Sequence, residues 1–271
     1  HKTSSAASDV YKRQPYKLTI VSSGGGTNAI SALLEVPGAS NTILESHIPY
    51  SKESMNSFLN KEPDHYCSLD TCLNMAANAF KKSKQIDTSS KTKHLLGISI
   101  TANLATTYEK KGDHKFFIVV QAYDYTKYLE CYLDKGKRTR EEEEELITAC
   151  VISLLADSCG FEFTIPEIDE DIKINKVIAE KSWKKLFNNK VGFISNNQNN
   201  PELIFPGSFN PLHEGHIKMK ELAEKKTGMH TTFEICANNA DKPPLTFYEI
   251  KRTIDQFQND ESWMLTSAGR F

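Results

Sequence analysis

The sequence lacks long apolar runs, closely paired cysteines and a strong net charge. Its apolar stretches, such as residues 116–120, have the length of a β-strand, whereas a spanning helix needs roughly 20 apolar residues, so we expect no membrane span. The six cysteines contain no Cys-x-x-Cys pair, and no signal peptide precedes them, which indicates reduced thiols in a cytoplasmic protein. A net charge of -2 gives no reason to expect binding to nucleic acid or to a membrane surface.

The composition is that of a folded protein with more than one domain. The chain has 271 residues, of which 39% are hydrophobic and 25% charged, and this length is sufficient for two separate cores. Residues 1–14 show no periodicity, and we interpret them as an artefact or a disordered tail. The Asn-rich stretch 196–200 is the clearest linker signal, and we place a domain boundary there.

The most informative stretch is residues 205–216, Phe-Pro-Gly-Ser-Phe-Asn-Pro-Leu-His-Glu-Gly-His. Residues 202–205 are typical of a short strand, 206–211 of a turn, and 213–226 of a helix that Gly228 ends. The apolar positions expected to form one buried stripe of this helix are Ile217, Leu222 and Ala223. The first turn of a helix has unpaired backbone N–H groups and the positive end of the dipole, so this arrangement favours a bound anion.

His213 and His216 lie three residues apart and therefore share one face of the predicted helix. Two imidazole N–H groups at a helix N-terminus suit a phosphate, although a His-x-x-His pair alone could equally hold zinc. The spacing differs from the His-Glu-x-x-His pattern of metalloproteases.

These motifs, Gly-Ser-Phe-Asn-Pro followed by His-x-Gly-His, resemble the signature of the cytidylyltransferase-like nucleotidyltransferases. The family transfers a nucleotidyl group from a nucleoside triphosphate, here ATP or CTP, to a phosphate-bearing acceptor. The resemblance implies magnesium carried by the triphosphate, with no metal site of the protein itself. It implies catalytic roles for His213 and His216. The nucleotide contacts that it implies are Gly207, Ser208, Phe209, Asn210 and Gly215, together with Lys242 in a later Asn-Ala-Asp-Lys-Pro-Pro loop.

The first half of the chain resembles the C-terminal domain of the CinA family, known for nicotinamide-nucleotide amidohydrolase activity. The resemblance rests on the Gly-rich turn at 21–26, on Pro-Gly-x-Ser ending at Ser40, and on Tyr50. The chain also departs from the family. Met55 stands where the family has a lysine, although Lys52 is near, and residues 98–105 lack the family's glycines. A serine without a base within hydrogen-bond reach is not activated, so we expect a degenerate site at Ser40, Tyr50 and Lys52. The resemblance leaves self-association through this domain open.

We therefore predict an α/β protein in which a CinA C-terminal-like domain (15–160) is followed by a connector (161–200) and a partial Rossmann-like parallel-sheet domain (201–271). The connector is expected to contain a helix over 177–187. A second phosphate-binding motif, which the resemblance places late in a complete domain, is not found, so we expect a fragment of a longer nucleotidyltransferase. The acceptor is unknown, with nicotinamide nucleotide metabolism as one context. The alternatives are an amidohydrolase that uses Ser40 with Lys52, and a nucleotide-binding module without catalysis.

Overall fold

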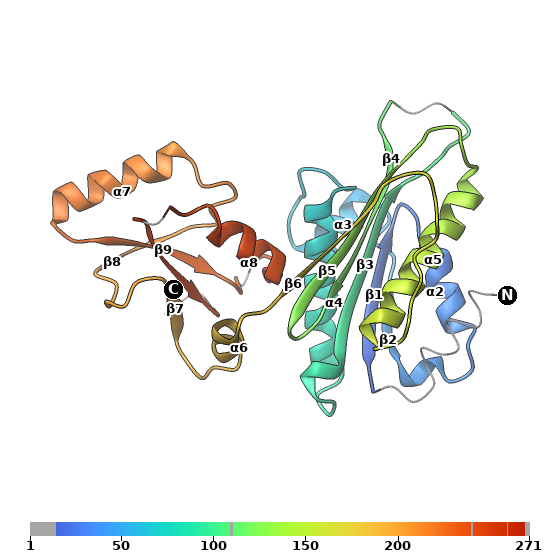
Figure 1. The fold of residues 1–271 in the computed structure, drawn as a ribbon, viewed down its shortest axis with the longest axis horizontal. Helices are drawn as coiled ribbons and strands as arrows, with labels where there is room; N and C mark the ends of the chain where they lie inside the picture. The colour runs from blue at the N-terminus through green and yellow to red at the C-terminus, as the bar shows by residue number, and fades with distance from the viewer. Residues whose placement is uncertain (1–14, 109–110, 240, 259, 269–271) are drawn as a thin grey trace. The chain divides into compact units, whose positions relative to one another are not determined.

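The computed structural model describes residues 15–108, 111–239, 241–258 and 260–268 (Figure 1). The chain divides into two compact units, His1–Lys176 and Val177–Phe271. Each unit has its own sheet and its own hydrophobic core. The predicted mixed α/β fold with two sheets is therefore confirmed. Residues 1–14, which we interpreted as a tail or an artefact, lie outside the described residues.

The sheet of the first unit has six strands in the order β2-β1-β3-β4-β5-β6. The strand bounds are Lys17–Ser23 (β1), Ile43–His47 (β2), Leu95–Asn103 (β3), His114–Gln121 (β4), Tyr125–Leu133 (β5) and Ile172–Ile178 (β6). β1 pairs in parallel with β2 and β3, and β4 runs antiparallel to β3 and β5. The predicted strand pair in 116–133 corresponds to β4 and β5.

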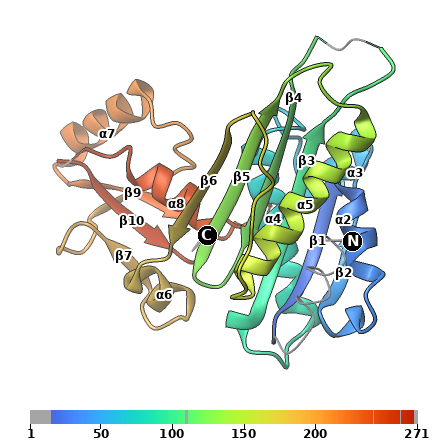
Figure 2. The same ribbon diagram turned by 45° about the vertical axis from the view of Figure 1, so that its right-hand side comes forward.

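Helices cover both faces of this sheet (Figures 1 and 2). Their bounds are Thr27–Leu34 (α2), Lys52–Leu59 (α3), Leu69–Ile86 (α4) and Arg140–Ser158 (α5), with 3₁₀ turns at Ala39–Asn41 (η1) and Thr92–His94 (η2). Successive β1 residues point to opposite faces: Ile20 joins the core with α2 and α5, and Val21 joins the cluster with α3 and α4. α4 crosses β3 so closely that a Cβ on Gly97 would lie 2.2 Å from the backbone nitrogen of Phe80, so only glycine fits there.

The second unit has a four-stranded sheet in the order β7-β10-β9-β8. Its elements are α6 (Lys181–Phe187), β7 (Phe193–Ser195), β8 (Leu203–Pro206), α7 (Glu214–Thr227), β9 (Thr231–Cys236), α8 (Phe247–Ile254) and β10 (Ser262–Thr266). β8, β9 and β10 are parallel, and β7 pairs with β10 in the antiparallel direction. The predicted strand, turn and helix of the signature correspond to β8 and α7, and Gly228 ends α7 in the left-handed conformation with φ 70°.

Residues 161–200 differ in part from the predicted connector. The two compact units meet at Lys176 and Val177, within this region. The predicted helix over 177–187 is wrong at 177–180 and confirmed at 181–187, because β6 continues to Ile178 at the edge of the first sheet and α6 begins only at Lys181. The Asn-rich stretch is attached to β10, since the side-chain oxygen of Asn196 accepts the backbone N–H of Trp263 at 2.8 Å. Pairing with a neighbouring strand, rather than local propensity, decided the β6 segment.

The predicted buried stripe of α7 is also wrong. Among the described residues of this helix none is buried, and Leu222 is 53% exposed. Ile217 packs partly against the core of the second unit. β8, the strand that leads into α7, is the edge of its sheet, and an edge offers a helix less apolar surface than the centre of a sheet.

Candidate functional site

The carboxyl ends of β8, β9 and β10 lie at one edge of the second sheet, because these three strands are parallel. The backbone N–H of Gly207, directly after β8, donates to the carbonyl oxygen of Glu234 in β9 at 3.1 Å. The loops after β9 and β10 are also joined, since the Asn238 side chain donates to the Ser267 carbonyl at 2.6 Å. In open α/β sheets, ligands bind beyond the carboxyl ends of the strands, and the signature turn lies at such an edge.

Phe209 anchors the signature turn in the core of the second unit. Its side chain is 1% exposed, and its φ of 44° is in the left-handed region that side chains other than glycine seldom adopt. Its ring centroid lies 5.1 Å from that of Phe233, 5.8 Å from that of Phe257 and 5.2 Å from the ring of His216. Because the ring is buried, Phe209 can face a ligand only through its backbone.

Gln256 holds both ends of the same turn. Its side-chain Nε2 donates to the carbonyl oxygen of Phe209 at 2.9 Å, and its Oε1 accepts the backbone N–H of Leu212 at 2.8 Å. One side chain thereby provides hydrogen-bond partners for the Phe209 carbonyl and the Leu212 N–H, which lie in a turn and not in a helix or strand. Gln256 lies just after α8, so the packing of that helix positions the turn.

The two signature histidines are stacked, with ring centroids 3.7 Å apart and an interplanar angle of 27°. The backbone N–H of His213 donates to Nδ1 of His216 at 3.2 Å. An imidazole that accepts at Nδ1 carries its proton at Nε2 when it is neutral, so Nε2 of His216 is a donor. Partial burial, together with the neighbouring His213, lowers the pKa of His216 below its ordinary value.

Gly215 and the exposed turn residues leave space beside this pair. A Cβ on Gly215 would lie 3.0 Å from Cε1 and 3.1 Å from Nδ1 of His213, so a larger residue would push against the His213 ring. Ser208 and Asn210 are exposed on the turn. Lys242 is also exposed and lies on the loop that leaves the carboxyl end of β9, at the same edge as the turn.

Within the described part of the chain there is no group of three or more His, Cys, Asp or Glu residues that could hold a metal ion. No helix in the described part of the chain is both long enough and apolar enough to cross a membrane.

The residues of the expected CinA-like site lie in three successive segments of the first unit. Ser40 lies in η1, before β2, and Lys52 begins α3, after β2. Tyr50 is 67% exposed, and Nζ of Lys52 lies 5.8 Å from the ring centroid of Tyr66. In the chain, Ser40 and Lys52 therefore lie on either side of β2.

Met55, which stands where the CinA family has a lysine, is a core residue of the first unit. Its side chain is 1% exposed and packs with α4 residues and Val21 in the cluster beneath α3. An unpaired lysine in that cluster would be costly to bury.

Residues 204–267 match the cytidylyltransferase-like family. This confirms the resemblance predicted from the signature, for a segment that runs from β8 to the loop after β10. The match includes both histidines, the Phe209 turn, Lys242 and Gln256. A comparison with curated proteins gives no match.

Solved structures of competence-damage proteins are similar to the larger, N-terminal part of the chain. The competence/damage inducible protein CihA from Agrobacterium tumefaciens has 15% identity and a TM-score of 0.45, with 58% of this chain and 96% of that chain covered. A competence or damage-inducible protein from Enterobacter asburiae has 15% identity, a TM-score of 0.46 and the same coverage. A CinA superfamily protein from Klebsiella pneumoniae has 12% identity and a TM-score of 0.45 over 59% of this chain and 97% of that chain.

The sequence analysis did not identify the residues outside the signature turn that hold it in place. Gln256 and Phe257 both contact it from the end of α8. Nothing in the local sequence distinguishes Gln256 from a surface glutamine, since its role depends on two backbone groups 44 and 47 residues earlier.

Proposed function

We propose that the second unit is the nucleotide-binding part of a nucleotidyltransferase that transfers a nucleotidyl group from ATP or CTP to a phosphate-bearing acceptor and releases pyrophosphate. The observation that carries this proposal is the stacked pair of His213 and His216 at the N-terminus of α7. It lies inside the segment that matches the cytidylyltransferase-like family.

The chemistry required is positioning and charge stabilisation rather than a covalent nucleophile. Nε2 of His216 supplies a donor at the N-terminus of α7, where an anion is favoured. The backbone at Gly207 to Phe209 lies against the triphosphate in this proposal, and Lys242 adds a cation from the loop after β9. Gly215 keeps the His213 ring unobstructed.

Magnesium enters this proposal with the triphosphate. Mg²⁺ is commonly held by one or two carboxylates together with substrate phosphates, and the described residues have no larger metal-binding group. Its contribution would be to neutralise phosphate charge. Nicotinamide mononucleotide is one acceptor to test, because the sequence resemblance of the first unit implies a family that acts on nicotinamide nucleotides.

Calorimetric titration of the chain with ATP and with CTP, each with magnesium, tests the nucleotide site. His216→Ala should weaken binding about 10- to 100-fold, the effect of losing one hydrogen bond to a charged group. His230→Ala is the matched control, because His230 precedes β9 and so lies at the opposite edge of the same sheet. Equal affinities for His216→Ala and the unchanged chain would remove the proposed role.

Pyrophosphate release with candidate acceptors then separates transfer from binding. Release that depends on His216 supports the transferase. Nucleotide binding without release from any acceptor would identify a nucleotide-binding module. The amidohydrolase alternative has no comparable support, since Ser40 and Lys52 lie at opposite ends of β2.

A further inference from the structure

The amide of Gln256 is inserted into the signature turn. Phe209 and Leu212 are the first and fourth residues of one segment, and a direct hydrogen bond between the C=O and the N–H of such residues closes many β-turns. Here the Gln256 side chain stands between the two groups, since Nε2 donates to the Phe209 carbonyl at 2.9 Å and Oε1 accepts the Leu212 N–H at 2.8 Å. The amide therefore acts as a spacer that sets the distance between the two ends of the segment.

Three hydrogen bonds fix the orientation of this amide. Besides the Phe209 carbonyl, Nε2 donates to the carbonyl of Thr253 in α8 at 3.4 Å. An amide nitrogen has two N–H donors, so the protein itself uses both. Exchanging Oε1 and Nε2 would place an acceptor against two carbonyl oxygens. Gln256 has no donor left for a ligand and can influence a ligand only by way of the turn.

α8 is fixed along its length, and its position determines where the amide lies. Before the helix, the backbone N–H of Leu245 donates to the carbonyl of Ala237, directly after β9, at 2.9 Å. Within the helix, Ile250 is fully buried. After the helix, the ring of Phe257 is stacked on that of Phe233, with centroids 5.2 Å apart. The core of the second unit, rather than the turn itself, therefore holds the spacer.

The segment that the amide spans separates the two parts of the proposed nucleotide site. Gly207 and Ser208 precede it, and His213, the N-cap residue of α7, follows Leu212 directly. In the proposed function, the backbone of the first part and the histidine pair of the second reach the same triphosphate. A misplacement of about 1 Å among groups that position a substrate can cost about 100-fold in rate, so the width of this segment affects the whole site.

We propose that Gln256 is a positioning residue of the nucleotide site, which holds the signature turn open so that the Gly207 backbone and the histidines of α7 contact the same triphosphate. This inference rests on the proposed function, because it concerns how that site is formed. Gln256 does not touch the nucleotide, so its replacement acts through the spacing of the turn.

Calorimetric titration of Gln256→Glu with magnesium and ATP or CTP, at several pH values, tests the proposal. When ionised, the new carboxylate still accepts the Leu212 N–H but sets an acceptor against the Phe209 carbonyl, so at about pH 7.5 binding should be about tenfold weaker than in the unchanged chain. A protonated carboxyl has an O–H donor and regains the lost hydrogen bond. The ordinary pKa of a glutamate is about 4.3, and a hydrogen bond from its neutral form raises it. The difference from the unchanged chain should therefore shrink as the pH falls to about 5. Titration of the signature histidines affects both chains and cancels from this difference.

Two further variants complete the experiment. Gln256→Ala removes both turn contacts and should weaken binding at every pH, whereas Gln258→Ala, at an exposed position after α8, should leave it unchanged. Tryptophan fluorescence verifies that each variant is folded, and if Gln256→Ala does not fold, the pH dependence of Gln256→Glu decides the question.

The outcomes separate this inference from the proposed function. If His216→Ala weakens nucleotide binding but Gln256→Glu binds as tightly as the unchanged chain at about pH 7.5, or differs from it equally at every pH, the positioning role is overturned and the proposed function stands. If the unchanged chain binds neither ATP nor CTP, the proposed function fails, and this inference fails with it.

Discussion

Replacing Gly207 by alanine should destabilise the second unit through a steric clash in the signature turn. A Cβ at this position would lie 2.6 Å from Cε1 and Cζ and 3.1 Å from Cε2 of the Phe209 ring. The ring cannot move into solvent cheaply, since it is 1% exposed and lies against Phe205, Phe233 and Phe257. The glycine backbone itself is not in the left-handed region, so the clash is the only expected cost.

Overpacking of a filled core costs about 1–3 kcal/mol in the free energy of unfolding. For a unit of this size, each kcal/mol lowers the melting temperature by about 4–8 °C. Both tryptophans of the chain, Trp183 and Trp263, lie in the second unit, so urea denaturation followed by tryptophan fluorescence reports on this unit alone. Displacement of Phe209 should also disturb His216, and ATP or CTP should bind less tightly.

A double-mutant cycle with Phe209→Leu identifies the cause. The smaller side chain makes room for the new methyl group, so Gly207→Ala should cost less in that background. Gly228→Ala is the control. A Cβ added to Gly228 would have no atom within 4 Å, and the φ of this residue is +70°. The loss of stability in Gly228→Ala therefore comes from the backbone conformation alone and should be equal in both backgrounds. A Gly207→Ala change below about 0.5 kcal/mol, the usual range of neutral surface substitutions, would refute the clash.

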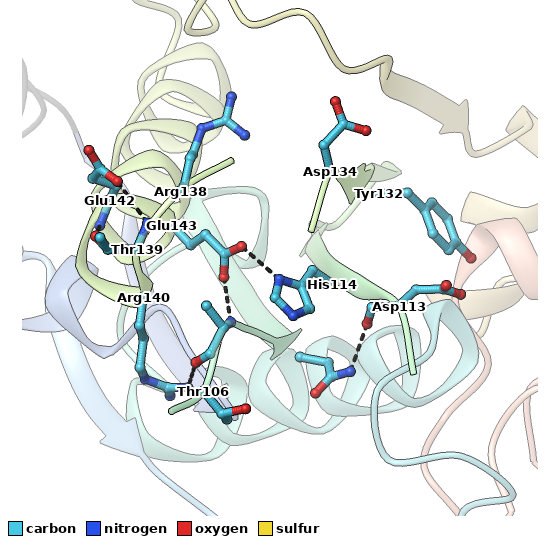
Figure 3. A network of polar contacts seen from close by, with 12 residues as sticks. Thr106, Asp113, His114, Tyr132, Asp134, Arg138, Thr139, Arg140, Glu142 and Glu143 are labelled. Carbon is cyan, nitrogen blue, oxygen red and sulfur yellow. Dashed lines mark hydrogen bonds and ion pairs between the residues drawn. The ribbon is translucent and has the colours of Figure 1, made fainter. Parts of the chain in front are cut away.

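Three other results are expected. Gln256→Ala should lower the free energy of unfolding of the second unit by about 1–2 kcal/mol, because two turn groups lose their partner, while Gln258→Ala at an exposed position should be nearly neutral in the same urea experiment. The lowered pKa of His216 means that the unfolded state binds a proton more readily, so the second unit should lose stability as the pH falls below about 6.5; an equal acid-induced loss in His216→Asn would contradict this. Glu143→Ala should destabilise the first unit by about 1–3 kcal/mol, because buried His114 and the backbone N–H of Ala105 lose their hydrogen-bond partner (Figure 3), and unchanged hydrogen exchange of the first-unit amides would contradict this.

The sequence predicts much of the second unit because its signals are local. Gly207 and the prolines beside it mark a turn, the spacing of His213 and His216 places them on one helix face, and Gly228 marks the helix end. Prediction from local sequence fails where contacts with other segments determine the secondary structure or the burial of a residue. Residues 177 and 178 suit a strand or a helix, and pairing at the edge of the first sheet made them a strand. α7 has an apolar period, yet at the sheet edge none of its described residues is buried.

The candidate sites divide in the same way. The sequence by itself determined the identity and spacing of the signature residues, including Gly207 and the two histidines, because the chain within one turn and one helix brings them together. Only the tertiary structure decided that Gln256 holds the turn and that Met55 is buried against α4 and Val21. These relations depend on contacts between segments far apart in the chain, which periodicity and turn chemistry do not encode.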